Sequence, residues 1–116
     1  MTTEIRKKGG EQRKLTRVSI PDHPQIFDAH SNVVVGQLVN LSTEGLMMMS
    51  PSAIKPGTLL QCRIPLRCNE EVIEIMIGVE SLWCDGADES GVCWTGFHII
   101  DISPQHHKMI STLIYD

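Results

Sequence analysis

The chain has 116 residues, of which 41% are hydrophobic, and a formal net charge of −4. This length fits one globular domain with a single packed core. No apolar run approaches the ~20 residues that span a bilayer, and the polar first residues contain no secretory apolar segment. These features argue against membrane insertion and predict a cytoplasmic protein.

The charge is unevenly distributed along the chain. Residues 1–17 hold six Lys or Arg against two Glu, a net charge of +4, whereas the remaining residues hold four basic and twelve acidic side chains, a net charge of −8. A basic head this short suits a small anion better than long nucleic acid, because no positive track continues along the chain. We therefore expect no binding to DNA or RNA.

The first elements are an arm and an interrupted strand. Residues 1–14 have almost no apolar content and predict a flexible N-terminal arm. Leu15 to Ile20 alternates as a strand does, but Pro21 and Pro24 interrupt it, which predicts an edge or a bend. Val33 to Val39 is the next run and strongly favours β-structure.

Further short strands follow, and the chain ends in a helix. The strands are expected at residues 46–49, 58–66, 72–83 and 92–100. Ser103 can cap a helix that begins at Pro104. Its apolar stripe consists of Met109, Ile110, Leu113 and Ile114. Six or so strands and one helix predict a small antiparallel barrel, with the amphipathic helix covering an opening.

Two short motifs stand out. Asn40, Ser42 and Gly45 form N-x-S-x-x-G between two strands; Asn and Ser bond nearby backbone, and Gly takes a positive φ or lets another group approach. Arg13 and Arg17 form R-x-x-x-R where the arm becomes a strand. Arginine can bond phosphate or the guanine edge bidentately and can stack on a base. Each motif alone has a plain alternative: an ordinary β-turn, and two exposed arginines in weak ion pairs.

Together, the two motifs resemble the pattern of the PilZ domain, R-x-x-x-R followed by D/N-x-S-x-x-G, and match it at all five positions. The closing strand, residues 94–101, and the helix after it are also similar to the family. The resemblance implies a six-stranded antiparallel β-barrel of PilZ type with a C-terminal α-helix over one opening. It also implies a flexible arm at residues 1–10 and a PilZ domain at residues 11–116.

The resemblance implies a bacterial receptor for the second messenger cyclic di-GMP, with no catalytic cofactor. Arg13 and Arg17 would bond guanine edges and phosphates and stack on a purine. Asn40 would accept a hydrogen bond from a guanine N–H. Ser42 would hold a guanine or a phosphate through its hydroxyl, and Gly45 would keep the surface clear and set the turn.

Two other positions bear on the ligand. Gln12 stands where many members of the family carry another Arg, and it favours one ligand per chain over a stacked pair. Trp83 either offers a base an aromatic platform near the site or is a core or rim tryptophan. The affinity and the oligomeric state do not follow from these residues.

The resemblance implies a binding switch in which the ligand orders the arm and alters contact with an effector protein. The usual outputs of the family are motility, exopolysaccharide or biofilm formation and virulence. The alternative is a protein-interaction adaptor of the same fold that binds no nucleotide. We expect no enzyme and no metal site, since no nucleophile–base set or metal spacing appears. The residues considered for such sites are Cys62, Cys68, Cys84, Cys93, His98, Asp101, His106 and His107.

Overall fold

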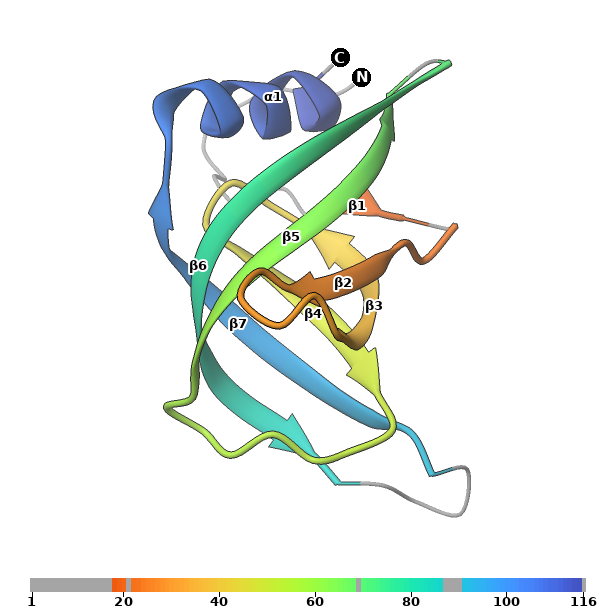
Figure 1. Cartoon of the computed structure of the whole chain (residues 1–116), viewed down its shortest axis with the longest axis vertical. Helices are drawn as coiled ribbons and strands as arrows, with labels where there is room; N and C mark the ends of the chain where they lie inside the picture. The colour runs from red at the N-terminus through yellow and green to blue at the C-terminus, as the bar shows by residue number, and fades with distance from the viewer. Residues whose placement is uncertain (1–17, 21, 69, 87–90, 116) are drawn as a thin grey trace, which may run out of the picture.

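A computed structural model describes residues 18–20, 22–68, 70–86 and 91–115 of the chain. The predicted arm, with Gln12, Arg13 and Arg17, lies outside the described residues. Seven strands and one helix are arranged as Figure 1 shows. In chain order they are β1 (Val18–Ser19), β2 (Gln25–Asp28), β3 (Val34–Leu41), β4 (Gly45–Ser50), β5 (Leu59–Cys68), β6 (Glu71–Asp85), β7 (Cys93–Ile102) and α1 (Pro104–Tyr115).

The strands form one antiparallel sheet that closes into a barrel. Their order is β1-β3-β2-β5-β6-β7-β4, and β4 also pairs with β3. β1 and β2 both lie on the side of β3 away from β4, with Val18 opposite Leu41 and Gln25 opposite Gln37. They are two pieces of one interrupted strand. The barrel therefore has six strands, which confirms the predicted fold.

The interruption lies where the prolines predicted it. Ile20 N–H still donates to Val39 O at 2.9 Å, and Leu38 N–H donates to Pro24 O at 2.8 Å. Between them, His23 has a φ of 48°. Because proline offers no N–H to a ladder, the chain bends away from β3 and then returns to the same neighbour.

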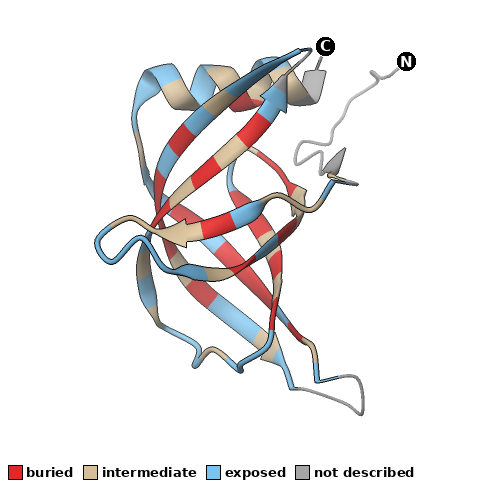
Figure 2. Ribbon diagram, turned by 45° about the vertical axis from the view of Figure 1, so that its right-hand side comes forward, coloured by how far each residue is buried: buried red, intermediate tan, exposed pale blue. Residues whose placement is uncertain are grey.

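Buried and exposed residues alternate along the strands, as the colours of Figure 2 show. The inward-facing side chains form one core, and the largest of them is Phe97 of β7. Ile110 of α1 is also fully buried, and Met109 and Leu113 pack against the core. The helix lies across one end of the barrel (Figure 1), so Met109, Ile110 and Leu113 of the predicted stripe close that opening as expected.

The start of α1 has the predicted N-cap and one contact with β6. Ser103 Oγ accepts the N–H of His106 at 3.1 Å, which is the predicted N-cap. His106 is half-buried, and its Nδ1 accepts the N–H of Met76 at 3.1 Å. The pairing of β6 with β7 ends at Ile77 and Ile102, so the His106 ring provides an acceptor for the next backbone N–H of β6, that of Met76.

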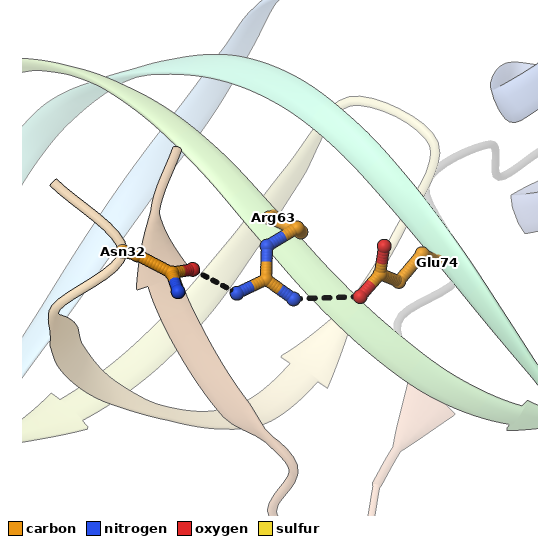
Figure 3. A network of polar contacts seen from close by, with 3 residues as sticks. All are labelled: Asn32, Arg63 and Glu74. Carbon is orange, nitrogen blue, oxygen red and sulfur yellow. Dashed lines mark hydrogen bonds and ion pairs between the residues drawn. The ribbon is translucent and has the colours of Figure 1, made fainter. Parts of the chain in front are cut away.

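Arg63 of β5 links three elements on the side of the barrel opposite β4, as Figure 3 shows. Its guanidinium donates to Glu74 of β6 at 2.6 Å and to Asn32 in the loop after β2. It also lies 4.3 Å from the ring centroid of Phe27, a cation–π contact. With these three contacts, Arg63 holds β5 to β6, to β2 and to the loop after β2, which is a structural role.

Candidate functional site

The N-x-S-x-x-G turn joins β3 to β4 through a buried serine. The Ser42 hydroxyl donates to Gly45 O at 3.1 Å and accepts from the N–H groups of Gly45 at 3.0 Å and Glu44 at 3.3 Å. One donor and two acceptor positions are all that a hydroxyl has. Ser42 is also only 1% exposed. Its geometry therefore fits the turn, and its direct contact with a ligand stays a prediction.

Gly45 begins β4 directly after the turn and is buried. Among the described glycines, positive φ occurs at Gly57 and Gly91, so Gly45 does not need the left-handed conformation. Leu46 points into the core, which places Gly45 on the outer side of β4, opposite His98 of β7. The sequence offered two reasons for a glycine here, a positive φ or the close approach of another group, and the second remains as a prediction.

Asn40 is a half-buried residue near the end of β3. It lies opposite Ser19 of β1 on one side and opposite Met47 of β4 on the other. Val18, one residue before Ser19, lies opposite Leu41. The first described residues of the chain are therefore fixed directly beside the N-x-S-x-x-G turn.

A row of outward positions connects Asn40 to Trp83. Met47 pairs with Gly96 of β7, and Gly96 pairs with Trp83 of β6. Paired positions share a face of the sheet, and three strand spacings correspond to about 14 Å. The row lies outside because its neighbours Leu46 and Phe97 are core residues.

Trp83 covers Gly96 on this outer face. A Cβ added to Gly96 would overlap the indole and lie 2.7 Å from its Cζ2 atom. Trp83 is 45% exposed, so it is not a core tryptophan. Its use as a platform for a base stays a prediction. Trp83 was a predicted candidate, whereas the places of Met47 and Gly96 beside it follow only from the strand pairing.

Among the described residues, the outer face that β4, β6 and β7 form beside Asn40 carries no Lys or Arg. Glu80 and Asp85 lie on the outer side of β6. Met47 and Met49 are half-buried there, whereas Met48 points into the core. An anion bound on this face needs cations from elsewhere in the chain.

The described residues offer no metal centre: no three His, Cys, Asp or Glu side chains gather among them. Cys62, Cys84 and Cys93 are free thiols. Burial, with a smaller effect of the nearby Asp28 charge, raises the pKa of Cys62 to about 12 and makes it an unreactive thiol. Within the described part of the chain, no helix is long and apolar enough to cross a membrane.

Comparison with known proteins identifies the family. The model of the PilZ domain matches residues 11–116. The PilZ domain of Escherichia coli YcgR, solved with c-di-GMP, has a TM-score of 0.65 and 16% identity, and the alignment covers 90% of each chain. YcgR in complex with c-di-GMP gives the same score and identity over 90% of this chain and 45% of that one.

The Bacillus subtilis inhibitor of motility, MotI/DgrA, has a TM-score of 0.75 and 13% identity, with 93% of this chain and 51% of that chain covered. This chain thus spans about half the length of MotI. Comparison with curated protein sequences gives no match. At these identities, the similarity to solved structures establishes the barrel and its helix.

Proposed function

This chain belongs to the PilZ domain family, and we propose that it is a receptor for cyclic di-GMP. The observation that carries the proposal is the pairing of β1 with β3. Val18 lies opposite Leu41 and Ser19 lies opposite Asn40. Arg17 directly precedes Val18 in the sequence, which supports a position of the R-x-x-x-R motif close to the N-x-S-x-x-G turn.

The chain between the two arginines is long enough for both side chains to contact one ligand. Arg13 lies four residues before Arg17, a span of up to about 14 Å in extended chain. The row from Asn40 to Trp83 has a similar length by strand spacing. In this proposal the arginines close over the ligand, while Asn40 accepts a guanine N–H and Trp83 stacks under a base.

The charges of the outer face favour a ligand site in which the arginines bind the phosphates and the outer face contacts the bases. Cyclic di-GMP carries two phosphodiester charges, and β4, β6 and β7 supply no cation. Arg13 and Arg17 supply the missing charge from the arm. Each good bidentate arginine–guanine contact is worth ~1–3 kcal/mol, and each stacked base ~1–3 kcal/mol. A micromolar complex needs ~8 kcal/mol net, which two arginines, one amide and one platform can supply.

Ligand binding is proposed to act through the arm. The described barrel is closed and holds a single core, so it has little freedom to change shape. An arm that folds onto the outer face would create a new surface at little cost to the barrel. An effector protein that reads this surface would convert ligand binding into an output. Motility control is the leading output, because the similar MotI is an inhibitor of motility.

Calorimetric titration with cyclic di-GMP tests the proposal. Wild-type protein should bind one ligand per chain, as Gln12 suggests. Arg13→Ala and Arg17→Ala should each remove most of the binding heat and leave the circular dichroism spectrum unchanged. Arg67→Ala is the matched control, because Arg67 is an exposed arginine of β5 that belongs to neither motif. Binding that survives both arm substitutions would refute the site, and no binding by wild type would favour the adaptor alternative.

A further inference from the structure

A second row of outward residues lies next to the row that ends at Trp83. Met49 of β4 pairs with Trp94 of β7, and Trp94 pairs with Asp85 of β6. Cys93 and Thr95 on either side of Trp94 are buried, so Trp94 faces outward. Trp94 is 37% exposed, and Asp85 is exposed. None of these residues belongs to the R-x-x-x-R or N-x-S-x-x-G motif.

The two rows are close enough to serve one dinucleotide. Trp94 is two residues from Gly96 on the same face of β7, a distance of about 7 Å. Trp83 and Trp94 occupy diagonal positions of the β6–β7 ladder, since Trp83 pairs with Gly96 and Asp85 pairs with Trp94. Trp94 and Asp85 are directly opposite, so their Cβ atoms are about 5 Å apart. From Asn40, two strand spacings and two residues along the strand give about 12 Å to Trp94.

The chemistry of this pair selects one kind of base. A carboxylate accepts two hydrogen bonds side by side. Guanine presents two adjacent donors, N1–H and the N2 amino group, whereas adenine presents the N1 lone pair at the same edge. An indole beside the carboxylate supplies a stacking surface. The negative charge of Asp85 also disfavours a phosphate there, so a neutral base is the part of an anionic ligand that fits.

We propose that Trp94 and Asp85 form a second guanine subsite on the outer face of β6 and β7. One guanine of cyclic di-GMP is read at Asn40, and the other stacks on Trp94 and donates its N1–H and N2 hydrogens to Asp85. The inference rests on the proposed function. The inference goes beyond the proposed function because it assigns the selectivity for a second guanine to two residues outside the family motifs.

Binding measurements on variants test the subsite directly. Trp94→Ala should weaken cyclic di-GMP binding by about 5- to 100-fold, the value of one stacked base. Asp85→Asn should lower the preference for cyclic di-GMP over cyclic di-AMP by about tenfold or more. The matched controls are Ile100→Ala and Asp101→Asn, two exposed residues farther along β7, which should bind as wild type.

Fluorescence separates direct stacking from an indirect effect on Trp83. The chain has two tryptophans, so Trp83→Phe leaves Trp94 as the sole tryptophan, and the tryptophan emission should change saturably with cyclic di-GMP. The double variant Trp83→Ala/Trp94→Ala should lose about the product of the single losses. A double variant no weaker than Trp83→Ala would show that Trp94 only supports its neighbour, which would overturn the subsite.

The remaining outcomes distinguish this inference from the proposed function. If Trp94→Ala and Asp85→Asn bind like wild type while Arg13→Ala does not, the subsite is wrong and the receptor stands. If wild type itself does not bind cyclic di-GMP, the receptor proposal fails and the subsite fails with it.

Discussion

Replacing Ser42 with alanine should destabilise the barrel even without ligand. The substitution removes the acceptor for the Gly45 N–H, a 3.0 Å bond inside a turn where the serine is 1% exposed. Gly45 O keeps its 2.8 Å bond from the Ser42 N–H, and the N–H of the exposed Glu44 can turn to water. One buried donor is therefore orphaned, which costs about 1–3 kcal/mol. For a domain of this size, that lowers Tm by about 4–12 °C.

Urea unfolding followed by tryptophan fluorescence measures this change, with the m value expected to stay constant. Ser31→Ala is the matched control, because Ser31 Oγ accepts the Val33 N–H at 3.3 Å in an exposed loop where water can replace it. The control should change the free energy of unfolding by less than about 0.5 kcal/mol. An equally small change in Ser42→Ala would refute the conclusion that the turn occupies this hydroxyl.

Three further predictions follow from the described contacts. Ile110→Ala should cost about 2–5 kcal/mol in urea unfolding, because the fully buried side chain closes the barrel end; a loss below about 1 kcal/mol would contradict that packing. Gly96→Ala should displace the Trp83 indole and shift its emission in a Trp94→Phe background, since the added Cβ would lie 2.7 Å from Cζ2; an unchanged spectrum would refute the overlap. The backbone N–H of Ser31, and after it that of His30, lowers the pKa of Asp28. The contribution of Asp28 to stability is therefore present above its unfolded-state pKa and is lost as pH falls through its folded-state pKa. Asp28→Asn should be less stable than wild type at neutral pH and equally stable in acid, and a difference in stability that does not depend on pH would contradict this.

The parts of the fold that follow short-range rules were predictable. Ser42 bonds groups three residues or fewer away, so the turn could be inferred from its own residue types. The N-cap at Ser103 has the same range. Alternation located the strands because one face of each had to be buried. The break at Pro24 followed from the missing proline N–H.

The parts that depend on long-range register could not be derived. The bond between His106 and Met76 joins residues thirty positions apart, and nothing near His106 signals it. The β7 partners of Glu80 and Ser81 depend on an irregularity between Ser81 and Trp83, and a second irregularity between Gly78 and Val79 restores the first register. Each shifts the partner by a residue, so counting back from the hairpin loop gives the wrong neighbours.

The division of the first strand into β1 and β2 has a mechanical consequence. β1 is two residues long and pairs only with β3, whereas β2 pairs with β3 farther along the same edge and β4 pairs along its opposite edge. β1 can thus separate from β3 without breaking the pairing of the other strands. Fraying there draws on a few ladder bonds rather than on the cooperative unfolding of the whole molecule. Under the proposed function, a ligand that contacts this segment would therefore stabilise the pairing of β1 with β3 without rearranging the other strands.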